Sequence, residues 1–167
     1  DLEKYKRDIK QKLIKKNLKI YELKGKPIPE FNLKLLTGGH LTSESLKGKP
    51  TLINFWFTNC TPCLEEMPIL NEIKSKFGKQ VNFIAITFQD EKEVNTLLSY
   101  RDFDFTHLID SRDYVKKIGL SGYPKTLILD KNLVVKSIPK NILNNVTEEL
   151  EFKSNIVNKL NELKNVR

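Results

Sequence analysis

The sequence predicts an α/β fold in which a central mixed β-sheet is flanked by helices. Short apolar runs of strand length alternate with helical segments between residues 51 and 129, and this alternation indicates β-α-β crossovers with parallel strands. Turn residues at 38–39 and 130–132 predict hairpins that add antiparallel strands. The chain has 167 residues, 39% hydrophobic and 30% charged, which suits one domain with a real core. No apolar run approaches the roughly 18 residues that cross a bilayer.

The N-terminal segment predicts a basic helix. Residues 3–16 place Tyr5, Ile9 and Leu13 on one helical face. Residues 1–26 hold ten Lys or Arg against four Asp or Glu, and so carry most of the net charge of +8. Basic arms can bind nucleic acid or anionic lipid, but this one lacks the interleaved aromatic residues that stack on bases. We expect a solvated amphipathic helix.

A break at residues 25–29, which hold one glycine and two prolines, separates this helix from the rest of the chain. We therefore expect a basic helical extension at residues 1–24 and the main domain at residues 25–167. Within the domain, alternating apolar residues at 31–36 predict a strand, and the Gly-Gly turn leads to a second short strand near residues 40–41.

The middle of the chain predicts the crossover units. A helical turn at 43–46 precedes a near-continuous apolar strand at 51–57, as expected for a central parallel strand. A helix then follows at 61–77, with Leu64, Met67, Leu70, Ile73 and Phe77 at mixed spacings of three and four and Gly78 at its end. Another apolar strand is predicted at 81–88.

The remaining elements complete the alternation. Asp90 can cap a helix that reaches about Tyr100, and Asn145 with Glu148 fits a capping box for the last helix. The other predicted segments are a strand at 105–109, a helix at 110–119, strands at 126–129 and 133–137 around a tight turn, and the final helix to about Leu163.

Cys60 and Cys63 are the only cysteines, and they stand in a CxxC motif at a strand-to-helix junction. This arrangement is typical of redox chemistry. At a helix N-terminus the unpaired N–H groups and the helix dipole favour a thiolate, so we assign Cys60 as the attacking sulfur and Cys63 as the resolving one. Pro62 fits the first helical turn.

Two other interpretations of the cysteine pair remain open. A structural disulfide would close only a tiny loop and would stabilise the fold little. A zinc site would need two more ligands, and the only histidines, His40 and His107, have a spacing unlike that of a zinc finger.

Several segments together resemble the thioredoxin superfamily. Residues 56–68, W-F-T-N-C-T-P-C-L-E-E-M-P, resemble its redox motif, and residues 122–130 resemble its cis-proline loop and following strand. The block at residues 27–56 and the strand–helix material at 89–118 narrow the resemblance to the TlpA/ResA branch of extracytoplasmic thiol–disulfide oxidoreductases. The resemblance covers residues 25–165. It implies a thioredoxin-like fold with an N-terminal β-hairpin and an added strand–helix insertion.

The resemblance also implies roles around the motif. The Tyr123–Pro124 bond would be cis, and this turn would stand opposite the cysteines, with the Tyr123 backbone pairing with the substrate. Trp56, Thr61 and Pro62 fall at substrate-binding positions. Each of these five residues is therefore expected to contact the substrate.

Glu66 matches the acidic residue that this branch carries just after the motif, whereas Asn54 stands where thioredoxin itself has a buried Asp. We expect Glu66 to relay the proton that Cys63 loses, with a low-dielectric site raising its pKa; the alternative is a solvated surface carboxylate. Glu65 is expected only at the surface. Pro68, in the middle of the predicted helix, should kink it or divide it in two.

The function expected from the resemblance is the reduction of disulfides in exported proteins, in the periplasm or cell envelope. Apocytochrome c is an implied substrate class, and cytochrome c maturation the implied process. The Cys60–Cys63 couple is the expected redox group, without another cofactor or a metal. Expected partners are protein disulfides or dithiols and a membrane thiol electron donor, not nucleic acid. Membrane attachment is expected only through a segment preceding residue 1.

Three residues beside the reactive sulfur depart from the family pattern: Asn59, Thr61 and Lys125. They bear on substrate choice and redox potential, not on reaction type. Two alternative functions share this fold. A peroxiredoxin-like peroxidase needs a Pro-x-x-x-Thr-x-x-Cys arrangement, which the residues before Cys60 lack. A copper chaperone of the Sco type spaces its cysteines CxxxC, although thiolates with a histidine do suit copper.

Overall fold

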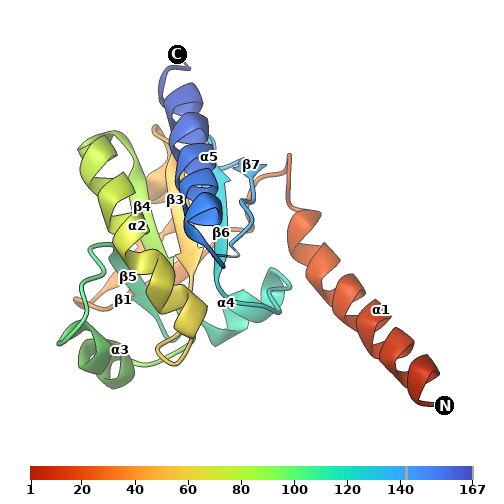
Figure 1. The fold of residues 1–167 in the computed structure, drawn as a ribbon. Helices are drawn as coiled ribbons and strands as arrows, with labels where there is room; N and C mark the ends of the chain where they lie inside the picture. The colour runs from red at the N-terminus through yellow and green to blue at the C-terminus, as the bar shows by residue number, and fades with distance from the viewer. Residues whose placement is uncertain (142, 167) are drawn as a thin grey trace.

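The computed structural model describes residues 1–141 and 143–166, with the backbone alone for residues 13–18. Its strands form one mixed sheet in the order β2-β1-β5-β4-β3-β6-β7 (Figure 1). The strands are β1 (Asn32–Leu35), β2 (His40–Thr42), β3 (Thr51–Phe55), β4 (Asn82–Ile86), β5 (Thr106–Ile109), β6 (Lys125–Leu129) and β7 (Val135–Ser137). The helices are α1 (Leu2–Tyr21), α2 (Thr61–Phe77), α3 (Glu91–Leu98), α4 (Arg112–Lys117) and α5 (Val146–Lys164), with 3₁₀ turns η1 (Ser43–Leu46) and η2 (Gly78–Gln80).

The centre of the sheet is parallel and its margins are antiparallel. β3 pairs in parallel with β4, and β4 with β5, whereas β6 runs antiparallel to β3. All five residues of β3 are buried, as expected for a strand covered on both faces. The chain leaves β3 after Phe55 and enters α2 at Thr61, so the cysteine motif lies at the carboxyl end of the central strand.

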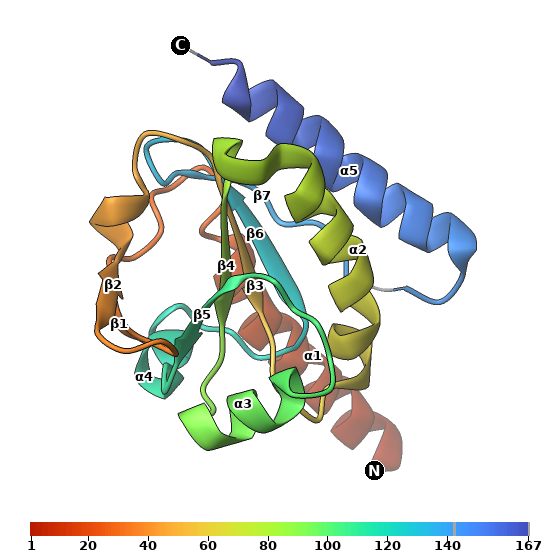
Figure 2. The same cartoon turned by 90° about the vertical axis from the view of Figure 1, so that its left-hand side faces the viewer.

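The two faces of the sheet carry separate halves of the core. Along β3, Leu52 packs with side chains of α2, α3 and α5, whereas Ile53 and Phe55 pack with α4 and with Ile20 of α1. This alternation follows from the two-residue period of a strand. Figure 2 shows α2 and α5 together on one face and α4 on the other.

The predicted α/β class and the order of elements are confirmed. The sequence bounds of η1 and α2 agree with the structure, and Asp90 closes a complete capping box with Glu93. At α5 the box differs in one contact: Asn145 accepts from the Glu148 N–H, but the Glu148 carboxylate accepts from the Asn144 N–H and not from that of Asn145. The carboxylate therefore reaches one residue further back.

Pro68 lies inside α2 without dividing it, because the helix runs unbroken from Thr61 to Phe77. The interpretation as two short helices is wrong. Proline has no N–H to donate to the carbonyl four residues earlier, which here belongs to Leu64. The guanidinium of Arg101 donates to that oxygen at 3.3 Å. A side chain from outside the helix thus replaces the missing donor.

α1 is longer than the predicted helix at 3–16, and its two ends have different surroundings. Tyr5 and Ile9 are exposed near its start, whereas Ile20 in its last turn is only 1% exposed and belongs to the core. The side chain of Leu13, the third residue of the predicted face, lies outside the described residues. Figure 1 shows the N-terminal part of α1 projecting away from the body of the molecule.

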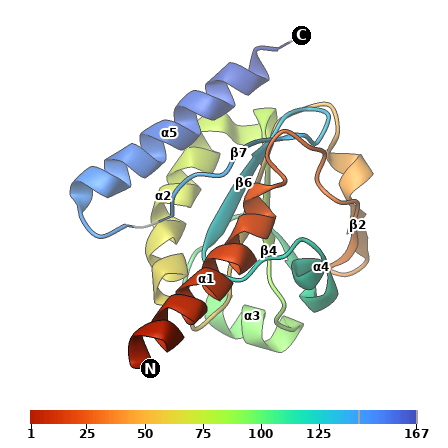
Figure 3. The ribbon, with the colours of Figure 1, turned by 90° about the vertical axis from the view of Figure 1, so that its right-hand side faces the viewer.

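The segment after α1 pairs with the edge of the sheet. The Gly25 N–H donates to the Val135 carbonyl at 2.8 Å, and the Val135 N–H donates to the Lys26 carbonyl at 2.9 Å. The Ile28 N–H donates to Leu133 at 2.9 Å. These bonds hold the end of α1 in place, where it passes close to β6 (Figure 3). Among the helices that the structure describes, none has the length and apolar character of a membrane span.

Candidate active site

The cysteine pair forms a disulfide at the start of α2. Cys60 and Cys63 are joined by an S–S bond of 2.05 Å. Cys60 is the N-cap residue, and its sulfur accepts the Cys63 N–H at 3.3 Å. Because N–H donation and the helix dipole act on Sγ of Cys60, this position stabilises a negative sulfur. Cys60 is 5% exposed and Cys63 1%, so Cys60 is the more accessible of the two.

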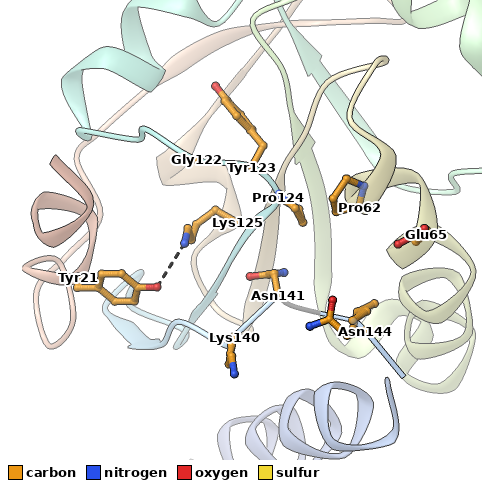
Figure 4. A pocket seen from close by; sticks show the side chains of 11 residues that line it. Tyr21, Pro62, Glu65, Gly122, Tyr123, Pro124, Lys125, Lys140, Asn141 and Asn144 are labelled. Atoms are coloured by element: carbon orange, nitrogen blue, oxygen red, sulfur yellow. Dashed lines mark hydrogen bonds between the residues drawn. The ribbon is translucent and has the colours of Figure 1, made fainter. Parts of the chain in front are cut away.

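The Tyr123–Pro124 peptide bond is cis, as the resemblance implies. It borders a pocket of about 330 Å³ beside the CxxC motif. Figure 4 shows Pro62 and Glu65 of α2 on one side of the pocket and Tyr21 and Lys125 on the other. The lining residues are Tyr21, Pro62, Glu65, Gly122, Tyr123, Pro124, Lys125, Lys140, Asn141, Leu143 and Asn144. The pocket thus joins the motif, the cis-proline turn and the last residue of α1.

Glu66 is buried in a cluster of polar side chains between α2 and the sheet. It is 0% exposed, so the interpretation as a solvated surface residue is wrong. Asn141 donates its amide to Oε1 of Glu66 at 2.8 Å, and Asn54 donates to Oε2 at 3.5 Å. Both amides also donate to Oγ1 of Thr126, at 2.9 Å and 3.2 Å. The carboxyl group is therefore held at both oxygens.

Burial raises the pKa of Glu66 from 4.5 to about 8, because the ionised form loses its hydration. The hydrogen bonds from Asn141 and Asn54 and the charge of Lys125 act in the opposite direction and lower the pKa. Glu66 follows Cys63 by one helical turn, and residues three apart lie on the same helix face. A carboxyl group that titrates near neutral pH thus stands on the same face of α2 as the buried sulfur.

Trp56 is not positioned to touch a substrate. Its side chain is 0% exposed and packs edge-on against Phe103 and His107, with ring centroids 5.6 Å apart in both pairs. The assignment of Trp56 to substrate binding is therefore corrected. The physical reason is the strand period, since Trp56 shares with Leu52 the face of the sheet that α2 covers.

The other predicted contact residues lie around the motif. Thr61 and Pro62 are exposed in the first turn of α2. Pro124 is buried and Tyr123 is half-buried, with its ring edge-on to Phe57 at 5.3 Å and to Phe88 at 5.9 Å. Burial raises the pKa of Tyr123 to about 12, so the phenol stays neutral at physiological pH.

Four residues of the site were not selected from the sequence: Asn141, Thr126, Tyr21 and Lys140. Asn141 both lines the pocket and donates to Glu66, and its Oδ1 is buried with no hydrogen-bond partner among the described residues. It follows β7 in a segment without a motif. Thr126 joins the site because it is the register partner of Asn54 on β3, a pairing that only the structure reveals.

The two histidines lie apart from the cysteine pair in their contacts. His40 is exposed on β2, and the Nε2 of buried His107 lies 2.8 Å from the Phe103 carbonyl. Burial lowers the pKa of His107. Within the described residues, no three His, Cys, Asp or Glu side chains gather where they could hold a metal ion.

Comparison with known proteins finds relatives that are named thioredoxin-like proteins and thiol-disulfide oxidoreductases. The chain is 34% identical over 128 residues to the thioredoxin-like protein YneN of Bacillus subtilis, covering 74% of each chain. It is 34% identical over 117 residues to the thiol-disulfide oxidoreductase ResA of Geobacillus thermodenitrificans, covering 68% of this chain and 67% of the relative. These relatives confirm the resemblance inferred from the motifs.

Solved structures agree with the fold. The exposed lipoprotein thioredoxin Etrx1 of Streptococcus pneumoniae superimposes with a TM-score of 0.65 at 21% identity, over 81% of this chain and all of its own. This likeness supports the thioredoxin-like fold. The model of the AhpC/TSA family matches residues 24–138, which include the CxxC motif and the cis-proline turn. The chain therefore belongs to the AhpC/TSA family.

Proposed function

We propose that this protein is a thiol–disulfide oxidoreductase that reduces disulfides of other proteins through the Cys60–Cys63 couple. The observation that carries the proposal is the disulfide at the N-terminus of α2, beside the cis-proline turn and an open pocket. The relatives named thiol-disulfide oxidoreductase support the same chemistry.

The reaction runs in two exchanges. In the reduced protein, the Cys60 thiolate attacks one sulfur of a substrate disulfide, and the other substrate sulfur leaves as a thiolate that takes up a proton. The Cys63 thiolate then attacks Sγ of Cys60, which releases the second substrate sulfur and leaves the Cys60–Cys63 disulfide. The substrate gains two electrons and two protons. A thiol donor must then reduce the disulfide again.

Glu66 handles the proton of Cys63 in this proposal. Cys63 is almost fully buried, so its thiol needs a nearby base before it can attack. The pKa of Glu66, about 8, lets the carboxyl group exchange a proton near neutral pH. Asn141 connects this buried carboxyl group to the pocket. Thr61, Pro62, Tyr123 and Pro124 form the surface on which the substrate would lie.

We further propose that the enzyme works outside the cytoplasm, in the periplasm or cell envelope. The resemblance to the TlpA/ResA branch supports this location, and Etrx1 is named an exposed lipoprotein. Substrates would then be disulfides of exported proteins, apocytochrome c among them. The electron donor would be a membrane thiol protein, because an oxidising compartment supplies no general reductant. Residues 1–24 are proposed as an extension to the domain at 25–167.

Two cysteine variants test the proposal. Cys60→Ser should abolish reduction of insulin disulfides, and Cys63→Ser should accumulate mixed disulfides that non-reducing electrophoresis detects. Ser75→Ala, an exposed position on α2, serves as the matched control and should reduce insulin at the wild-type rate. Retention of wild-type activity by Cys60→Ser would contradict the proposal. Peroxide consumption and Cu(I) titration of the reduced protein test the two alternative functions directly.

A further inference from the structure

The pocket beside the CxxC motif has lysine side chains in its lining that the thiol–disulfide exchange itself does not require. Lys125 and Lys140 line it together with Tyr21, whereas Glu65 lines it from α2. Figure 4 shows Lys125 next to Tyr21, and Lys140 farther from Tyr21 with its side chain pointing away from Lys125. Both lysines lie apart from the α2 wall. A bound polypeptide would meet a positive wall on that side and a negative group on the other.

Among the described residues, Lys125 forms no ion pair with a carboxylate, although its charge acts on the buried Glu66. Its ammonium donates to the phenol oxygen of Tyr21 at 3.3 Å and lies 5.1 Å from the centre of the Tyr21 ring. None of the ion pairs found among the described residues includes Lys125 or Lys140. An ammonium group with one neutral acceptor retains donors for a charged partner, and hydrogen bonds to carboxylates are stronger than those to neutral groups.

The end of α1 holds this arrangement in place. Ile20 is buried in the core, which fixes the position of the next residue, Tyr21. The aliphatic part of Lys19 lies against Gly119, where a β-carbon would collide with it. Lys125 directly follows the cis-proline, so its side chain starts beside the place where a substrate backbone would pair. The position of Tyr21 therefore sets the position of the ammonium group.

We propose that this pocket selects protein disulfides whose cysteine is flanked by an acidic side chain, which Lys125 and Lys140 bind while Tyr21 positions Lys125. The inference rests on the proposed function and names its substrate class. Lys125 and Lys140 are then specificity-determining residues, and Tyr21 is a positioning residue. The N-terminal helix becomes part of substrate recognition through its last turn.

A series of peptide disulfides tests the proposal on the full chain. The peptides share one sequence with a single disulfide, and the residue flanking the attacked cysteine is Asp, Asn or Lys. The readout is kcat/KM for Asp divided by that for Asn. We expect a ratio of about 10 in the wild-type protein at low salt, falling as salt rises, with the Lys peptide slowest.

Variants assign the preference to residues. Lys140→Gln and Lys125→Gln should each lower the ratio about threefold, and Lys140→Glu should reverse the order of the Asp and Lys peptides. Each variant is judged by its own ratio of kcat/KM for the Asp and Asn peptides. A change in the overall rate of a variant therefore leaves the measured preference unaffected. Lys136→Gln, an exposed position on β7 outside the pocket, should keep the wild-type ratio. Tyr21→Phe should lower it less than Lys125→Gln does.

The failure of this inference is distinguishable from failure of the proposed function. Hydroxyethyl disulfide is uncharged and small, so its reduction by the wild-type protein reports the redox chemistry alone. If that reaction proceeds but the Asp and Asn peptides react equally, the acidic preference is wrong and the oxidoreductase stands. If neither hydroxyethyl disulfide nor any peptide reacts, the proposed function fails, and the inference fails with it.

Discussion

The amide of Asn141 donates a 2.8 Å hydrogen bond to the carboxyl group of Glu66, although the two residues are 75 positions apart in the chain. The bond joins the segment after β7 to the second turn of α2. A carboxyl group buried without such donors would be held neutral still more strongly. The pair therefore sets how readily Glu66 ionises in its buried site.

Replacing Glu66 with Gln should slow the second exchange. Gln has nearly the same volume but takes up no proton, so Cys63 loses its base. We expect release of the substrate from the Cys60 mixed disulfide to slow about 100-fold near pH 8. Stopped-flow measurement of both exchanges would separate the steps, because the attack by Cys60 should change little. A variant with unchanged second-step kinetics at every pH would remove Glu66 from the mechanism.

The same carboxyl group should make stability depend on pH. Its pKa rises from 4.5 to about 8 on folding, so between these values the folded state binds a proton that the unfolded state does not. The stabilisation is full below pH 4.5 and is lost as pH rises through about 8. Glu66→Gln has no such titration. As pH rises, the free energy of unfolding of the oxidised wild-type protein should therefore decrease relative to that of the variant by up to roughly 5 kcal/mol. Denaturant unfolding of both proteins across this range checks the slope, and parallel curves would contradict it.

Replacing Asn141 with Ala should move the titration of Glu66. The hydrogen bond from Asn141 lowers the pKa of Glu66, so its loss should raise that pKa further. It should also reduce the free energy of unfolding by about 1–3 kcal/mol, because two buried acceptors lose a donor. NMR titration of labelled glutamate measures the first effect. Asn155→Ala, at an exposed position of α5, should change neither quantity, and an unmoved titration in Asn141→Ala would refute the coupling.

Arg101 should stabilise α2 only because Pro68 is there. Removing the guanidinium by Arg101→Ala leaves the Leu64 carbonyl without a donor and should cost about 1–2 kcal/mol. In a Pro68→Ala background the new N–H can donate to Leu64, so the same replacement should cost less. A double-mutant cycle by denaturant unfolding measures the difference. Equal costs in both backgrounds would show that the contact is incidental.

The order of elements could be predicted because each carries a local pattern. The strands are short apolar runs, and Asp90 and Asn145 cap the helices that follow them. The burial of Glu66 could also have been predicted from the sequence. Cys63, Met67 and Leu70 define an inward stripe of α2, and Glu66 lies within it. Leu64, which the predicted stripe contained, is only partly buried.

What could not be predicted depends on contacts between distant segments. Asn141 meets Glu66 only when the segment after β7 folds back over α2, and nothing in its neighbours encodes that path. Tyr21 reaches the pocket because Ile20 is buried beneath the sheet, whereas the sequence suggested a solvated helix. Trp56 was assigned to substrate binding by resemblance, although the strand period places it in the interior.

The pairing of residues 24–28 with β7 has a consequence for how this molecule meets other chains. A free strand margin offers its backbone N–H and carbonyl groups to any extended polypeptide, and unfolded clients are rich in such segments. Here the bonds from Gly25, Ile28 and Val135 occupy those groups from within. Another polypeptide or a second copy would have to displace this segment before it could add a strand at that edge of the sheet.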